Sequence, residues 1–111
     1  MKILNTSGEL STKQVYDMTQ APNIGKMRDV VGQTLEIAGF VVYETETREG
    51  EIKKVLSVLT VEGEVFATNS RTFIEDFENI LEITGGEFRK IQAVEGISRA
   101  GRKFIQCLWV D

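Results

Sequence analysis

The feature of this chain that most constrains its fold is the order in which two kinds of hydrophobic pattern follow one another. Three β-type runs come first, then one stretch with helical spacing, then two more β-type runs. We predict strands over residues 31–47, 52–61 and 64–68, a helix over residues 72–84, and strands over residues 87–98 and 103–110. This pattern is typical of an all-β domain with a small helical content.

Glycines mark the points at which the predicted strands turn or bend. Gly50 and Gly63 lie in the short connections that follow the first and second strands, so the first three strands form consecutive hairpins. Ala38-Gly39 lies where the first strand changes from alternating to continuous apolar residues. A glycine at such a point predicts a bulge or a sharp bend. A first strand that bends in this way can serve both halves of a small barrel.

The central helix is predicted from an apolar face that contains Phe73 and Phe77. Thr72 with Glu75 fits a capping box at its start, and Gly85-Gly86 fits its end. We expect Phe73 and Phe77 to be core residues that close one open end of the barrel.

A second, short helix is predicted from Ser11 to about Thr19, because Ser11 and Gln14 fit a capping box. The first ten residues carry no regular pattern and are expected to be loosely structured. Pro22 and Gly25 indicate a connector before the first strand.

Strand-strand-strand-helix-strand-strand is the order of elements in the OB-fold, a five-stranded barrel that binds oligonucleotides or oligosaccharides. We therefore expect two parts, an N-terminal extension with the short helix over residues 1–30 and an OB-fold domain over residues 31–111. The helix between the third and fourth strands completes this assignment.

Composition argues against an enzyme. The chain contains no histidine, which removes the commonest general base and the commonest zinc ligand. Cys107 is the only cysteine, so it has no internal partner for a disulfide and no histidine to activate it as a nucleophile. No run of residues approaches membrane-spanning length. We expect a cytoplasmic protein with no catalytic residues, no metal, no cofactor and no membrane contact.

The acidic residues outnumber the basic ones by 17 to 13. Glu44, Glu46, Glu49 and Glu51 gather at the first hairpin, where a solvated acidic turn is expected. The alternatives are a weak site for a divalent cation, including that of a nuclease, or a repulsive element that keeps duplex DNA away. An acidic chain can still bind nucleic acid if its basic residues are concentrated locally and aromatic rings stack on bases.

Basic residues gather where the OB-fold binds its ligands, near the start of the second strand and in the loop between the last two strands. We predict phosphate contacts from five residues, which are Lys53, Lys54, Arg99, Arg102 and Lys103. The stretch from Gly96 to Val110 contains no acidic residue. Lys26 and Arg28 in the connector belong either to an ordinary surface loop or to a basic flap beside the binding groove.

Aromatic rings could stack on bases, at roughly 1–3 kcal/mol for each base. The available rings are Tyr43, Phe66, Phe88, Phe104 and Trp109, and core packing is the alternative for each of them. We predict stacking on Tyr43, Phe66 and Trp109.

Two stretches resemble a known family. Residues Gly63 to Phe77 read GEVFATNSRTFIEDF, and Gly101 to Phe104 read GRKF. These stretches are similar to the small single-stranded DNA-binding proteins encoded by bacteriophages and mobile elements of Gram-positive bacteria, over roughly residues 31–110. The resemblance implies an OB-fold that coats single-stranded DNA in phage DNA replication or recombination and has no enzymatic activity.

The sequence thus predicts a non-catalytic protein of the bacterial host cytoplasm that binds single-stranded DNA with little sequence preference. The alternative is an OB-type protein-interaction module of a replication complex, which the acidic balance and the amphipathic N-terminal segment suit. Replication or recombination proteins are further expected partners. An exposed strand edge could also pair two copies into a homodimer. Preference for DNA or RNA is left open, because it depends on contacts to the sugar 2′-hydroxyl.

Overall fold

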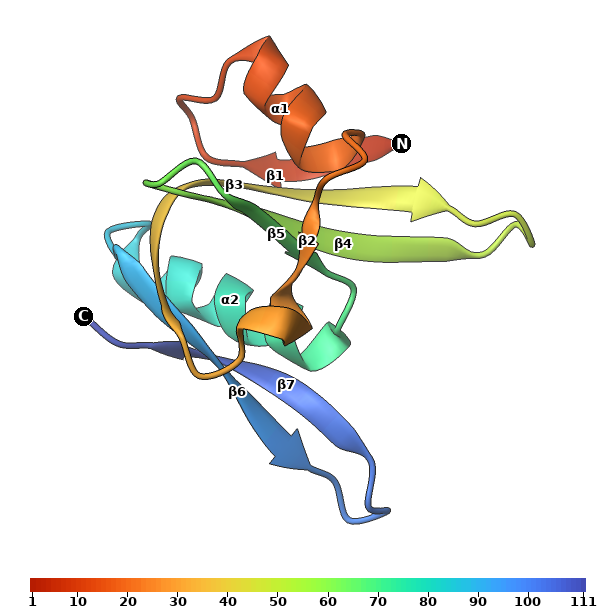
Figure 1. Ribbon diagram of the computed structural model, residues 1–111, viewed down its shortest axis with the longest axis vertical. Helices are drawn as coiled ribbons and strands as arrows, with labels where there is room; N and C mark the ends of the chain where they lie inside the picture. Colours follow the sequence, from red (N-terminus) through yellow and green to blue (C-terminus); the bar gives the residue numbers. More distant parts are fainter.

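The computed structural model describes all 111 residues of the chain. Its elements, in chain order, are β1 (Lys2–Thr6), α1 (Thr12–Thr19), β2 (Gly25–Lys26), the 3-10 helix η1 (Met27–Val30), β3 (Thr34–Glu46), β4 (Ile52–Thr60), β5 (Val65–Thr68), α2 (Arg71–Thr84), β6 (Lys90–Ile97) and β7 (Lys103–Trp109). Figure 1 shows a curled sheet that forms half of a barrel, with α2 packed against it. The predicted mostly-β class with two helices is confirmed. None of the helices is both long enough and apolar enough to cross a membrane.

The long strand β3 holds the two halves of the sheet together. The strand order is β2-β5-β4-β3-β6-β7, and β1 pairs with β3 outside this path. The first residues of β3, Thr34 to Glu36, pair with β6, and most of the strand pairs with β4. A register shift between Ile37 and Gly39 confirms the predicted irregularity at Ala38-Gly39. A Cβ atom at position 39 would lie 2.7 Å from Cδ2 of Leu10, so a side chain there would displace Leu10.

Helix α2 fills the space inside the curled sheet. Phe73 and Phe77 are fully buried, as predicted for core residues. The Phe77 ring meets the rings of Phe40 and Phe88 edge to face, with centroids 5.3 Å and 5.5 Å apart. The predicted helix start is wrong, because the N-cap is Ser70 rather than Thr72 and its hydroxyl accepts a hydrogen bond from the Phe73 N–H.

The C-terminal end of α2 is the one predicted from Gly85-Gly86. Gly85 adopts the left-handed conformation, with φ of 65°. Along its length the helix also fixes an edge of the sheet, since the Asp76 carboxylate accepts a hydrogen bond of 3.1 Å from the backbone N–H of Cys107 in β7.

The N-terminal segment contains two strands that the sequence does not predict. The sheet has seven strands where five are expected, and the first ten residues are not loosely structured. Strand β1 pairs antiparallel with the later part of β3, and β2 pairs parallel with β5. All five residues of β1 are exposed, so the strand has no alternating apolar pattern by which to predict it.

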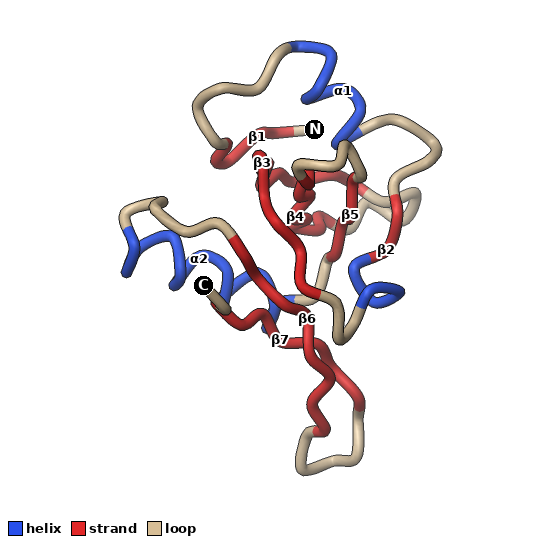
Figure 2. Tube along the Cα trace, turned by 60° about the vertical axis from the view of Figure 1, so that its left-hand side comes forward, coloured by secondary structure: helices blue, strands red, loops and turns tan.

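Helix α1 covers the outer face of the sheet near β1. Its capping box between Ser11 and Gln14 is present as predicted. Met18 of the helix is buried with Val41 and Tyr43 of β3 in a small second core. Figure 2 shows α1 and β1 together at one end of the molecule, and the β6–β7 hairpin extending from the other end.

Candidate nucleic-acid interface

A groove is lined by residues of β2, η1, β4, β5, α2 and β7. Figure 1 shows the ribbons of β2 and β5 between the β3–β4 hairpin and the β6–β7 hairpin. The groove consists of three adjoining hollows. The first, of about 690 Å³, lies between the start of β4 and the start of α2. It shares Asn69 with the second, of about 630 Å³, which β2, η1, β5 and β7 enclose. The second shares Arg28, Lys103 and Phe104 with a third of about 90 Å³. We call these three adjoining hollows together the basic groove.

The basic groove concentrates positive charge. Six of the 13 basic residues line it, namely Lys26, Arg28, Lys53, Lys54, Arg71 and Lys103. Four of the 17 acidic residues line it, namely Asp29, Glu51, Glu75 and Glu95. The lining therefore carries two net positive charges, whereas the rest of the chain, with seven basic and 13 acidic residues, carries six net negative charges. A local field of this kind attracts polyanions to one face of an acidic protein.

Three of the six cations are ion-paired within the chain, and all three pairs are partly solvated. Lys54 Nζ lies 2.9 Å from Glu78 Oε1, Arg71 Nε lies 3.0 Å from Glu75 Oε1, and Lys103 Nζ lies 3.8 Å from Glu95 Oε1. Exposed pairs contribute about 0–1 kcal/mol, so a phosphate could replace the carboxylate at little cost. Lys26, Arg28 and Lys53 form no ion pair.

The connector before β3 is held at the groove by its buried residues. Met27 and Val30 of η1 lie in the core, while Lys26 and Arg28 are exposed. Strand β2 pairs Gly25 with Phe66 and Lys26 with Ala67. A side chain at position 25 would force the Phe66 ring to move, because its Cβ would lie 2.8 Å from Cδ1 of Phe66. The two basic residues thus lie on an anchored segment beside the groove.

The start of α2 adds two features that the sequence analysis missed. Arg71 lines the first hollow, and Asn69 and Ser70 line the second. The N-terminus of a helix carries a partial positive charge, so this position favours an anion. Arg71 directly follows the Thr-Asn-Ser stretch, which could have placed it in the first turn of the helix. Assigning the helix start to Thr72 puts Arg71 outside the helix instead.

The structure brings together some of the basic residues predicted to contact phosphate. Lys53, Lys54 and Lys103 all line the groove. Arg99 and Arg102 are exposed in the turn that joins β6 to β7, next to Lys103 and beyond the hollows. They extend the positive charge of the groove along this hairpin.

None of the three rings predicted to stack on bases lines the groove. Tyr43 is only 6% exposed and packs beneath α1, and burial raises the pKa of its hydroxyl. Trp109 lies at the far end of β7, about 20 Å from Lys103 at the usual rise of a strand. Its Nε1 donates a 2.7 Å hydrogen bond to Asp111 Oδ1. Phe66 packs against the core and on Gly25. Phe104 is the only aromatic residue that lines the groove.

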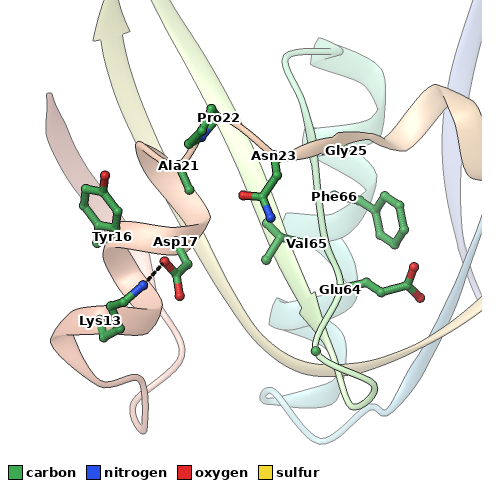
Figure 3. Close-up of a pocket in the computed structure, with 11 residues that line it drawn as sticks. Lys13, Tyr16, Asp17, Ala21, Pro22, Asn23, Gly25, Glu64, Val65 and Phe66 are labelled. Carbon is green, nitrogen blue, oxygen red and sulfur yellow. Dashed lines mark hydrogen bonds and ion pairs between the residues drawn. The ribbon is translucent and has the colours of Figure 1, made fainter.

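A separate pocket of about 680 Å³, drawn in Figure 3, lies between α1 and the β4–β5 turn. Phe66 lines this pocket. The Lys13 ammonium is 2.6 Å from the Asp17 carboxylate and 5.5 Å from the centre of the Tyr16 ring, so its charge is already balanced. Because Glu64 also lines the pocket, its lining residues carry one net negative charge, which makes this pocket unsuited to phosphate.

The glutamates of the β3–β4 turn and Cys107 are the other two chemical features of the sequence. The glutamates of the β3–β4 turn belong to no group of three or more side chains that could hold a metal ion. Burial, together with the nearby Asp76 carboxylate, raises the pKa of the Cys107 thiol to about 12. The thiol therefore stays protonated at neutral pH.

The arrangement of the groove suits an extended anionic chain. Its cations come from β2, η1, β4, α2 and β7, so they are spread along its length. Spread charges match a repeating phosphate backbone better than a single phosphate group. No model of a protein family, no curated protein and no solved structure matches this chain.

Proposed function

We propose that this protein binds single-stranded DNA in the basic groove, without catalysis and with little sequence preference, and coats it during phage replication or recombination. The observation that carries the proposal is the gathering of six cationic side chains in one groove of an acidic chain. The resemblance of the Gly63–Phe77 and Gly101–Phe104 stretches to phage single-strand binders supports DNA as the ligand.

We further propose that β3 to β7 with α2 form an OB-fold that is open between β5 and β7. The pairing order β5-β4-β3-β6-β7 supports this assignment. The two loops that flank the binding face of an OB-fold would then be the β3–β4 turn and the β6–β7 turn. Residues of both hairpins line the basic groove, which supports the same location for the ligand.

Binding of a single strand exchanges charges at the groove. Phosphates displace solvent from Lys26, Arg28 and Lys53 and compete with the carboxylates that pair with the other three cations. Each neutralised phosphate releases counterions from the strand, so the affinity falls as salt rises.

The test is a fluorescence anisotropy titration of labelled oligothymidine at several salt concentrations. A variant with Lys26→Ala, Arg28→Ala and Lys53→Ala is expected to bind on the order of 50-fold more weakly. The slope of log affinity against log salt should become shallower by about two, at roughly 0.7 for each lost contact. A variant with Lys13→Ala, Arg89→Ala and Lys90→Ala loses the same charge away from the groove and should bind like the parent. The proposal fails if the parent protein does not bind oligothymidine, or if the two triple variants weaken binding equally.

A protein-interaction module of a replication complex is the second candidate, and one observation favours it. Three of the first four residues, Met1, Ile3 and Leu4, are apolar and exposed. Exposed apolar patches often mark protein contacts. Absence of oligothymidine binding by the parent protein would favour this candidate over the first.

A further inference from the structure

Phe104 differs from every other phenylalanine of the chain in its surroundings. Phe40, Phe73 and Phe77 belong to the main core, and Phe66 and Phe88 pack against it. Phe104 belongs to neither hydrophobic cluster and is only partly buried. Its ring lines the second and third hollows of the basic groove instead. A ring in this position needs a role other than core packing.

The ring is held by Gly96, its partner across the β6–β7 hairpin. A Cβ atom at position 96 would lie 2.6 Å from Phe104 Cζ, 2.8 Å from Cε2 and 3.2 Å from Cε1. The Phe104 ring therefore lies directly against Gly96. The backbone of Gly96 does not itself require glycine, because its φ is not in the left-handed region. Glycine weakens a strand, so its presence here is explained by the space that the Phe104 ring occupies.

Two cations line the same hollows as the ring. Lys103 precedes Phe104 in β7, and Arg28 of η1 lines the same two hollows. A single strand whose phosphates contact these two side chains would carry a base past the ring. Unpaired bases stack on aromatic faces, whereas paired bases inside a duplex offer no free face.

We infer that Phe104 is the ring on which an unpaired base of the bound strand stacks, and that Gly96 is the positioning residue that sets the ring. The inference rests on the proposed function. It makes Phe104 the residue that selects strands with exposed bases. Such strands are preferred over a bare phosphate backbone and over duplex DNA.

The test compares two labelled ligands of equal length, oligothymidine and an abasic oligonucleotide with the same number of phosphates. The parent protein should bind oligothymidine about tenfold more tightly than the abasic strand. Phe104→Leu should lose this preference by weakening oligothymidine binding alone, with an unchanged salt slope. Phe104→Tyr should restore the preference. Gly96→Ala should reduce it, because the added methyl group displaces the ring.

Lys103→Ala serves as the matched control in the neighbouring position. It should weaken the binding of both ligands equally and make the salt slope shallower by about 0.7. Thermal unfolding of each variant identifies any that does not fold. If Phe104→Leu does not fold, the preference for oligothymidine is judged from Phe104→Tyr instead. The inference is overturned if Phe104→Leu weakens both ligands equally, if it weakens neither, or if the parent binds both ligands alike. In the last case the proposed function still stands, whereas failure of the parent to bind either ligand removes the proposed function itself.

Discussion

The β3–β4 hairpin and the β6–β7 hairpin have the same design and opposite charge. Both turn through a glycine with positive φ, Gly50 at 80° and Gly101 at 79°. Residues 46–51 of the first turn carry three glutamates and one arginine, whereas residues 98–103 of the second carry two arginines, one lysine and no acidic residue. Residues of both hairpins line the basic groove. If the groove holds single-stranded DNA as proposed, the β6–β7 turn would attract its phosphate backbone and the β3–β4 turn would repel it, so the strand would leave the groove along β6–β7.

The hairpins also differ in how their bases are held. The base of β3–β4 is flanked by β1 on one side and β5 on the other. The outer edge of β7 pairs with no strand, and the Asp76 carboxylate of α2 binds its Cys107 N–H. The positively charged hairpin is thus held by strand β3 along β6 and by helix α2 along β7, whereas the other hairpin is flanked by strands on both sides.

Reversing the charge of the β6–β7 turn should give the largest of the effects that distinguish the two hairpins. Arg99→Glu with Arg102→Glu makes this turn acidic like the other one, and we expect the affinity for oligothymidine to fall by roughly 30-fold, because two phosphate contacts become repulsive. Fluorescence anisotropy measures the effect. Lys2→Glu with Lys13→Glu makes the same change of charge at the opposite end of the molecule. An equal loss in both variants would show that net charge, rather than the position of the turn, governs binding.

Removing the helix support of β7 should give the next largest effect, on stability. Asp76→Ala leaves the Cys107 N–H without its acceptor, and we expect the free energy of unfolding to fall by about 1–2 kcal/mol. Asp76→Asn keeps an oxygen acceptor and should lose less. Urea denaturation measures both variants. If Asp76→Ala is as stable as the parent, the edge of β7 needs no support from α2.

The same pair of residues predicts a dependence of stability on pH. Burial and the Asp76 charge raise the pKa of Cys107 from its usual value of 9.0 to about 12. The folded state therefore keeps the thiol proton over a pH range in which the unfolded chain loses it. The contribution of Cys107 to the free energy of unfolding should be constant below pH 9 and fall between pH 9 and 12. Cys107→Ala removes the titrating group, so a fall of the same size in that variant would contradict this cause.

The two lysines at the start of β4 test whether an existing ion pair weakens the contribution of a groove cation. We expect Lys53→Met to weaken oligothymidine binding about fivefold and Lys54→Met about twofold, because Lys54 must first leave Glu78. Anisotropy titrations compare the two variants directly. Equal losses would mean that the Lys54–Glu78 pair has no influence on binding.

Neutralising the acidic turn should give the smallest effect and the opposite sign. Glu49→Gln with Glu51→Gln removes repulsion at the β3–β4 end, and we expect the affinity to rise about twofold to threefold through a faster association rate. Stopped-flow mixing with labelled oligothymidine measures this rate. The matched control is Glu82→Gln with Glu87→Gln, beyond the groove. A decrease in rate would mean that the acidic turn assists binding.

Much of the curled sheet could be predicted from the sequence, because its turns are marked locally. The strands from β3 to β7 lie within a few residues of their predicted bounds, since glycines separate them and their residues are partly buried. Strand β1 could not be found in this way. It is exposed throughout and is defined only by its pairing with β3, which follows about 40 residues later.

The groove could be predicted only in part, because spacing along a strand does not reveal which face a neighbouring element covers. Lys53 and Lys103 were located from their places at the ends of strands. Tyr43 also lies near the end of a strand, but on the face that α1 covers. Phe104 was indistinguishable from Phe66 until the core was known, because each lies in a strand beside apolar residues.

The place of Trp109 determines how the protein can be assayed. The sole indole of the chain lies at the opposite end of β7 from Lys103, where it donates a hydrogen bond to Asp111. Its emission should therefore respond to fraying of the C-terminus and hardly at all to occupancy of the groove. A titration followed by intrinsic fluorescence would give a flat curve even for a tightly held strand.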